Sequence, residues 1–189
     1  MNLFHRWYCN SDRWAKAMQQ YILPGVLGDT DLGDNVLEIG PGPGVTTDWL
    51  RARVPRLTAV EIDHKLAASL QQRMDGTNVT VIEGDATALT LPDGSFSAAV
   101  SFTMLHHVPS KELQDKLLAE ACRVLRPGGL FTGSDSLPSL MWNIYHVFDT
   151  RTPVDPATFG ARLEAAGFAD CKVNVWGKSG FNWRARKPG

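Results

Sequence analysis

Short apolar runs alternate with segments of helical spacing along most of the chain. Five of these runs begin at Val36, Leu57, Val79, Phe96 and Leu130. Apolar runs of this length without strict alternation are typical of strands that are buried on both faces of a sheet. Because strands that alternate with helices predict βαβ units, the pattern indicates an α/β fold with a doubly wound, mostly parallel sheet.

The N-terminal part of the chain predicts an amphipathic helix over residues 11–27. Ser11 is expected to cap this helix, and Pro24-Gly25 is expected to end it. Its apolar stripe consists of Trp14, Ala17, Met18, Tyr21 and Ile22. The N-terminal piece therefore has one face that must pack against the rest of the protein.

The C-terminal part predicts a helix followed by a hairpin. The helix is expected over Asp155–Ala166 and is ended by Gly167. Alternating apolar positions over Ala169–Trp176 and Phe181–Arg186 predict two strands joined by a glycine-containing turn. These two strands bring the expected number to seven.

A glycine turn follows the first apolar run, in the sequence V-L-E-I-G-P-G-P-G from Val36 to Gly44. Such a turn needs glycine because a Cβ would hinder the close approach of a ligand and would disfavour positive φ angles. Glu38 lies near the end of the strand. A site for pyrophosphate would not place a carboxylate beside the glycines, whereas a site for a cationic or amine-bearing ligand would.

The spacing of the glycines separates two kinds of ligand. The dinucleotide fingerprint G-x-G-x-x-G follows a strand and has its third glycine three residues after the second. Here the glycines occupy positions 40, 42 and 44, and Val45 stands where that fingerprint has its last glycine. The spacing disfavours a dinucleotide site, and a glycine turn without any ligand stays open at this point.

Acidic residues follow the next two apolar runs. Glu61 ends the second run, where a carboxylate can accept hydrogen bonds from both hydroxyls of a ribose. Asp63 precedes a helical pattern, so we expect it to cap that helix. The third run leads into Gly84-Asp85-Ala86, and the segment R-V-L-R-P-G-G-L-F at 123–131 closes a helix and starts the fifth strand.

These motifs, in this order and at βα spacing, resemble the class I S-adenosylmethionine-dependent methyltransferases of the small-molecule type, similar to the methyltransferase domain 11 group. The resemblance covers residues 35–135 by motif. It implies a single domain over residues 1–189, with a Rossmann-like seven-stranded sheet in the order 3-2-1-4-5-7-6 and only strand 7 antiparallel. It also implies a substrate lid over residues 138–152, and an N-terminal helical segment, 1–27, that packs over the ligand pocket or covers a sheet edge.

The resemblance implies S-adenosyl-L-methionine as the cofactor, and the spacing of the cysteines and histidines predicts no metal site. Glu38 and the backbone of Gly40 and Ser101 are expected to hold the methionine amino group of this cofactor. Glu61 is expected to hold the ribose, and Asp85 with Ala86 the adenine. The full set of expected cofactor-binding residues is Glu38, Gly40, Gly42, Gly44, Glu61, Ile62, Asp85, Ala86, Ser101 and Phe102.

Methyl transfer from a sulfonium needs alignment and proximity above all, and a base only where the acceptor must lose a proton. Side chains expected at the rim of the pocket are the candidates for such a base: His106, His107, Asp135, Tyr145 and His146. The resemblance implies a structural role for one of the two adjacent histidines, and we favour a structural role over a catalytic one for each. Asp135 is expected just past strand five, where it could equally cap the next segment.

The acceptor is predicted from the segment after the fourth strand. Nucleic-acid amino-methylating enzymes carry an Asn/Asp-Pro-Pro-Tyr-like run there, whereas this chain has S-F-T-M at 101–104. The net charge of −1 leaves no basic stripe for phosphates. We therefore predict a small, apolar or aromatic acceptor. Because residues 36–87 also resemble the ribosomal RNA adenine dimethyltransferases, a nucleic-acid methyltransferase is one alternative, and a non-catalytic cofactor-binding partner protein is another.

The remaining composition bears on the cellular compartment. The three cysteines are far apart and form no C-x-x-C pair, which favours a reducing cytoplasm over a disulfide or metal framework. No apolar run approaches the roughly 20 residues of a membrane helix, and Met1–Trp7 has no apolar core of a signal peptide. We expect a cytoplasmic protein without membrane contact, and the sequence does not predict its oligomeric state.

Overall fold

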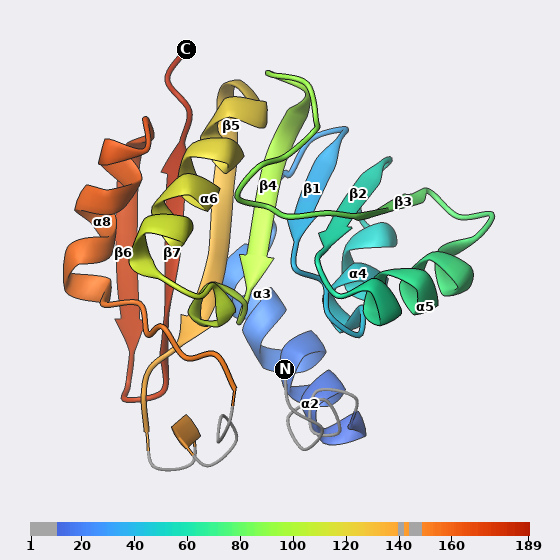
Figure 1. Ribbon diagram of the computed structural model, residues 1–189, viewed down its shortest axis with the longest axis horizontal. Helices are drawn as coiled ribbons and strands as arrows, with labels where there is room; N and C mark the ends of the chain where they lie inside the picture. The colour runs from blue at the N-terminus through green and yellow to red at the C-terminus, as the bar shows by residue number, and fades with distance from the viewer. Residues whose placement is uncertain (1–10, 140–141, 144–148) are drawn as a thin grey trace.

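A computed structural model of the chain describes residues 11–139, 142–143 and 149–189. These residues form a seven-stranded sheet in the order β3-β2-β1-β4-β5-β7-β6 (Figure 1). The strands are β1 (Val36–Ile39), β2 (Leu57–Glu61), β3 (Val79–Glu83), β4 (Phe96–Phe102), β5 (Leu125–Ser136), β6 (Ala169–Trp176) and β7 (Gly180–Arg186). Strands β1 to β5 pair in parallel, whereas β7 runs antiparallel to both β5 and β6. The predicted fold class, strand order and antiparallel strand are confirmed.

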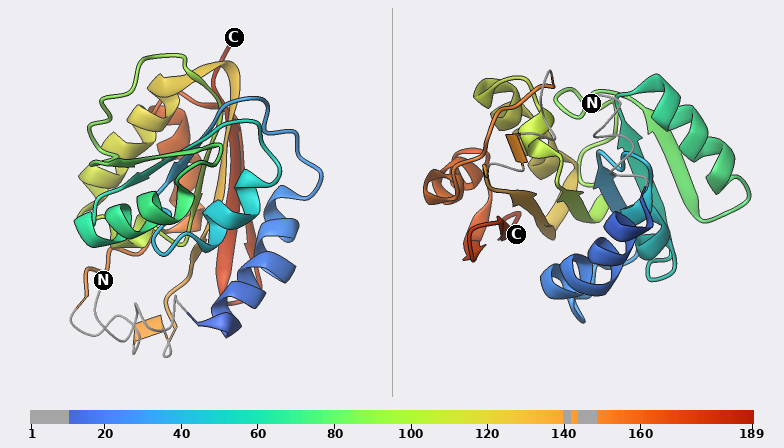
Figure 2. Two further views of the ribbon diagram at one scale, coloured as in Figure 1. Left: turned by 90° about the vertical axis from the view of Figure 1, so that its right-hand side faces the viewer. Right: turned by 90° about the horizontal axis from the view of Figure 1, so that it is seen from below.

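Helices cover both faces of the sheet, and Figure 2 (left) shows α3 and α6 on opposite sides of it. One core cluster joins Phe131 of the sheet to Leu118 of α6 and Phe159 of α8. A second cluster joins Val100 to Leu23 of α3 on the other face. The helical elements are α2 (Asp12–Ala17), the π-helical segment η1 (Met18–Ile22), α3 (Leu23–Leu27), α4 (Val45–Arg51), α5 (His64–Met74), the 3₁₀ turn η2 (Leu105–His107), α6 (Lys111–Val124) and α8 (Pro156–Ala165).

Side-chain caps fix the starts of three helices where the sequence predicts them. Ser11 caps α2, Asp63 caps α5 and Asp155 caps α8, each by accepting a hydrogen bond from a backbone N–H two or three residues further along. Gly167, with φ of +99°, follows α8 as expected. The predicted roles of Ser11 and Asp63 as caps are therefore confirmed.

The N-terminal helical segment does not end at Pro24-Gly25, and that prediction is wrong. The chain continues through α3 to Leu27, and the left-handed Gly28 follows. Pro24 is tolerated because it stands in the first turn of α3, where a missing N–H costs little. The π-helical turn before it pairs the N–H of Leu23 with the carbonyl of Met18, five residues back.

The same π-helical turn changes which side chains face the core. Met18 is buried, but Tyr21, which was expected in the apolar stripe, is 72% exposed. A turn with five-residue hydrogen bonds takes more residues than an α-helical turn, so a stripe counted at 3.6 residues per turn fails there.

Strand β5 is longer than predicted and contains Asp135, which was expected beyond its end. Parallel pairing with β4 stops at Ser134, but antiparallel pairing with β7 continues and places Asp135 opposite Phe181. Within the predicted lid 138–152, residues 140–141 and 144–148 lie outside the described residues, so the lid stays a prediction. No helix among the described residues combines the length and the apolar character needed to cross a membrane.

Candidate functional site

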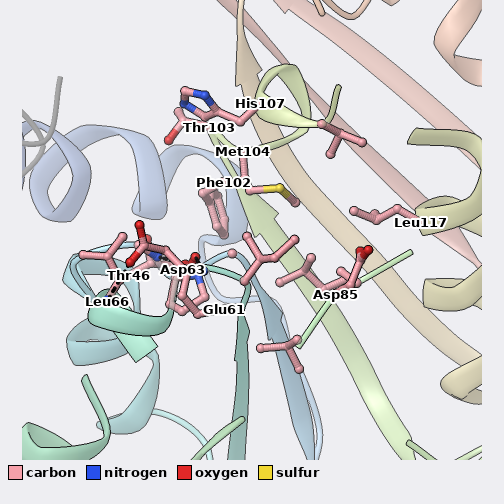
Figure 3. A pocket seen from close by; sticks show the side chains of 18 of the residues that line it. Thr46, Glu61, Asp63, Leu66, Asp85, Phe102, Thr103, Met104, His107 and Leu117 are labelled. Atoms are coloured by element: carbon pink, nitrogen blue, oxygen red, sulfur yellow. Dashed lines mark hydrogen bonds between the residues drawn. The ribbon is translucent and has the colours of Figure 1, made fainter. Parts of the chain in front are cut away.

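A cavity of about 330 Å³ opens where the strand order reverses, beyond the carboxyl ends of β1, β2, β3 and β4 (Figure 3). Its wall consists of the glycine turn, the residues after β2 and β3, the segment after β4 and part of α6. Trp14 and Met18 of the N-terminal helical segment also line it. The packing of this segment over the pocket, one of two predicted arrangements, is the one that the structure shows.

The structure brings most of the expected cofactor residues to this cavity. Those that line it are Gly40, Gly42, Glu61, Ile62, Asp85, Ala86 and Phe102. Glu38, Gly44 and Ser101 are not among its lining residues. Ser101 is fully buried within β4, paired with Ile39 and Gly133 of the neighbouring strands.

The three glycines of the turn all have positive φ angles, but for different steric reasons. A Cβ at Gly40 would overlap the side chain of Met104, and a Cβ at Gly44 would overlap that of Arg73. A Cβ at Gly42 would meet nothing within 4 Å. Gly42, which lines the cavity, is therefore the glycine of the turn whose Cβ position is open, and the other two glycines accommodate protein side chains.

Glu61 links the glycine turn to the end of β2. Its carboxylate accepts 2.9 Å hydrogen bonds from the backbone N–H groups of Gly42 and Asp63. Each carboxylate oxygen has a second lone pair, so Glu61 retains the capacity to accept hydrogen bonds from a ligand. The side chain is nearly buried at the floor of the cavity, beside Asp63 (Figure 3).

Glu38 lies behind the glycine turn and not within the cavity. It is only 2% exposed, and its carboxyl accepts a 2.6 Å hydrogen bond from the hydroxyl of Thr47 on α4. Desolvation by burial raises the pKa of Glu38 to about 8, against the lowering effect of the Thr47 hydrogen bond. A positive charge that binds near the turn would therefore stabilise the ionised form of Glu38 and lower its pKa.

The two adjacent histidines have different environments. His106 is buried, and its backbone N–H and Nδ1 both bond to the carboxylate of Asp135. The expectation that His106 and Asp135 stand at the pocket rim is therefore wrong, because Asp135 belongs to β5 and pairs with His106 inside the core. Gln114 of α6 secures the same turn by donating to the carbonyl of Leu105 at 3.0 Å.

His107 faces the cavity together with Thr103, at the side opposite Glu61 and Asp63 (Figure 3). Thr103 has a φ of +50°, a conformation that is rare for a β-branched residue. Non-glycine residues with such angles gather at functional sites, where the surrounding structure holds the strain. Tyr145 and His146, the remaining base candidates, lie outside the described residues.

Sequence reasoning placed two residues that shape this site only in general terms and missed two others. Met18 and Trp14 were expected to contact a pocket only through the general placement of their helix. Thr103 carried no signal, because nothing in its neighbours predicts a positive φ angle. Arg73 carried none either, since an arginine in the last turn of a helix is ordinarily solvated.

The charged side chains among the described residues of the cavity wall are all acidic. Its lining residues include Glu61, Asp63, Asp85 and Asp149, and no lysine or arginine is among those that the structure describes. Across the described ranges, no three His, Cys, Asp or Glu side chains gather as a metal site would require. The wall therefore favours a ligand that carries positive charge over one that carries phosphate.

Comparisons with known proteins agree with this geometry. The chain matches the family model described as a methyltransferase domain over residues 37–132. It is 35% identical over 159 residues to the "Probable ribosomal RNA small subunit methyltransferase A" of Haloarcula marismortui, which covers 80% of this chain and 49% of that protein. The chain thus spans about half the length of this curated relative.

Solved structures share the whole fold. The S-adenosylmethionine-dependent methyltransferase of Archaeoglobus fulgidus superposes with a TM-score of 0.76 at 20% identity, over 98% of both chains. Phosphoethanolamine N-methyltransferase 2 of Haemonchus contortus, solved with S-adenosylmethionine, gives a TM-score of 0.77 at 15% identity, over 100% of this chain and 61% of that one. At these identities the likeness shows the fold.

The family match begins in β1 and ends in β5, so it includes the glycine turn, the acids after β2 and β3 and the segment after β4. These are the parts that build the cavity, and they are also the parts that predicted the cofactor. The chain belongs to the class I S-adenosylmethionine-dependent methyltransferase family.

Proposed function

We propose that this protein transfers the methyl group of S-adenosylmethionine to a small acceptor that is apolar or aromatic and carries no anionic group. The charge of the cavity wall carries this proposal, since the described lining includes four acids and neither lysine nor arginine. A cofactor with a sulfonium and an amino group suits that wall. An acceptor with a phosphate or carboxylate would find no lysine or arginine among the described residues of the wall.

The residues at the glycine turn fit the cofactor. Gly42 leaves open the space that a Cβ would fill, and Glu61 offers acceptor capacity beside it. We assign Asp85 and Ala86, which line the cavity after β3, to the adenine. Bound S-adenosylmethionine supplies a methyl carbon that its positive sulfur has already activated, so the chain has to bind, orient and exclude water.

The acceptor end combines an apolar wall with two polar groups. Phe102, Met104 and Leu117 supply apolar surface, and His107 and Thr103 lie at the same side (Figure 3). We assign His107 the role of contacting the acceptor heteroatom, because it lines the cavity whereas His106 is committed to Asp135. Where the acceptor must lose a proton, the His107 ring is the group in position to accept it.

Ribosomal RNA methylation is the second candidate, and the 35% identity to the Haloarcula relative favours it. Against it stand the net charge of −1 and the absence of a described cationic side chain in the cavity wall. A nucleic-acid substrate needs cations that neutralise its phosphates. A third candidate, a cofactor-binding partner without catalysis, would keep the cavity and lack turnover.

One assay separates these candidates. The protein is incubated with methyl-labelled S-adenosylmethionine and, in parallel, with a panel of small phenols, quinols and amines or with small-subunit ribosomal RNA. Label in a neutral or amine acceptor, and none in matched carboxylates, is the expected result. Label in RNA, with a rate that falls steeply with salt, would replace the proposal by the second candidate. Saturable cofactor binding without transfer to any acceptor would favour the third.

A further inference from the structure

Arg73 reaches the glycine turn from outside the cavity. It stands in the last turn of α5, and its Nη2 donates a 2.8 Å hydrogen bond to the carbonyl of Pro43, between Gly42 and Gly44. Its Nη1 donates to the carboxylate of Asp48 on α4. Arg73 is not among the residues that line the cavity. Arg73 therefore bonds to the turn without reaching the cavity.

Gly44 accommodates this arginine. A Cβ at Gly44 would overlap the Arg73 guanidinium and lie 2.5 Å from the Cδ1 atom of Leu70. Its φ of +85° adds a second reason for glycine. The last glycine of the turn thus leaves room for a protein side chain, in contrast to Gly42, which leaves room on the cavity side.

Two side chains of one structural unit, the β2–α5 segment, bond to the backbone of the turn. Glu61 at the end of β2 accepts from the N–H of Gly42, and Arg73 at the end of α5 donates to the carbonyl of Pro43, one residue further along. Pro41 and Pro43 restrict this turn, but its three left-handed glycines have more conformations open to them in the absence of such anchors. Anchors that select one conformation before binding reduce the ordering cost of binding.

We propose that Arg73 is a positioning residue that clamps the glycine turn in its ligand-binding conformation, so that it contributes to S-adenosylmethionine affinity without touching the cofactor. The proposal rests on the cofactor of the family and is independent of the acceptor. Loss of a charge-assisted hydrogen bond at such a turn is expected to raise the dissociation constant about five- to thirtyfold.

Arg51 provides a matched control. It also pairs with Asp48, at 3.3 Å, and its side chain is 43% exposed, as is that of Arg73, but it has no recorded bond to the turn. The test measures S-adenosylmethionine affinity by titration calorimetry for the parent, R73A, R73K and R51A, with the melting temperature of each protein without ligand. R73A should bind weakly, R51A should bind within about twofold of the parent, and the two should melt at similar temperatures. The affinity of R73K should lie between those of R73A and the parent, since one ammonium group cannot contact both Pro43 and Asp48 as the guanidinium does.

A double-mutant cycle sharpens the test. Because the G44A methyl group would displace Arg73, adding R73A to G44A should cost little further affinity. R73A binding within twofold of the parent, or additive losses in the cycle, would overturn the clamp while leaving the cofactor assignment intact. R73A that melts far below R51A, with R73K binding as the parent does, would reduce Arg73 to a stability role. A parent protein that does not bind S-adenosylmethionine would overturn both the assignment and the clamp.

Discussion

The hydroxyl of Thr47 on α4 donates a 2.6 Å hydrogen bond to the carboxyl of Glu38 on β1, directly behind the glycine turn. Both side chains are buried, and no lysine or arginine bonds to this carboxyl among the described contacts. Burial raises the pKa of Glu38 from 4.5 to about 8. The protein without ligand therefore holds Glu38 largely protonated at neutral pH.

This shift predicts a pH-dependent stability. An acid with a raised pKa binds more protons in the folded than in the unfolded state, so the free energy of unfolding falls as pH rises from about 4.5 to about 8. The variant E38Q cannot ionise and can still accept the Thr47 hydrogen bond. We expect the melting temperature of E38Q, relative to that of the parent, to rise as pH increases across this range. Parallel melting profiles for the two proteins between pH 5 and 8 would contradict the shift.

The carboxylate of Glu61 predicts a large effect on affinity. In E61A the N–H groups of Gly42 and Asp63 lose their acceptor, and the ligand loses one as well. Each unpaired buried group costs about 1–3 kcal/mol, so we expect S-adenosylmethionine affinity to fall roughly ten- to hundredfold. Calorimetric titration measures this fall directly.

Glu83 supplies the control for that measurement. It stands opposite Glu61 in the register of β2 and β3, ends its strand in the same way and pairs with the exposed His64. It does not line the cavity. E83A should keep the parent affinity, and equal losses in E61A and E83A would mean that the cofactor does not depend on Glu61.

Substitution of Gly42 should lower cofactor affinity without costing more stability than a comparable glycine substitution elsewhere. An alanine there meets no protein atom within 4 Å but occupies space beside the cavity, at a φ of +55°. Gly76, which is equally open and has a φ of +70°, lies away from the cavity and serves as its match. G42A and G76A should lose similar stability, about 1 kcal/mol by denaturant titration. Only G42A should bind S-adenosylmethionine poorly, and similar affinities in the two variants would place the ligand elsewhere.

The two histidines predict opposite phenotypes. H106A leaves the buried Asp135 carboxylate without the Nδ1 partner, which should cost about 3 kcal/mol of folding stability. H107A removes a side chain that lines the cavity, and should change stability by less than about 1 kcal/mol while lowering turnover. Denaturant titration and the labelled-methyl assay give the two readouts. A stable but inactive H106A, or an unstable H107A, would exchange the assigned roles.

The order of the strands was predicted through the resemblance to the methyltransferases, and that resemblance rests on local motifs. The glycine turn, the acids after β2 and β3 and the glycine-linked hairpin of β6 and β7 each depend on neighbours in sequence. The predicted cofactor residues at the ends of strands, such as Glu61 and Asp85, lie at the cavity for the same reason.

What the sequence could not supply depends on contacts across the fold. Glu38 and Glu61 are both acids at strand ends, and only the packing of α4 over β1 places Glu38 behind the turn. Asp135 was expected at the rim because no local feature shows that β5 continues past Ser134. The strand is extended there by pairing with β7, which follows far along the chain. The Arg73 contact spans 30 residues, and neither partner carries a local signal.

The cavity wall collects residues from Trp14 near one end of the chain to Thr150 near the other. During synthesis, therefore, no ribosome-bound fragment that stops before residue 150 can present the complete wall. Of these residues Trp14 and Met18 leave the ribosome first, yet the segment after β4 that lines the same cavity is made much later. A ligand that needs the complete wall can consequently stabilise a nascent chain only after all of the parallel strands, β1 to β5, have been made.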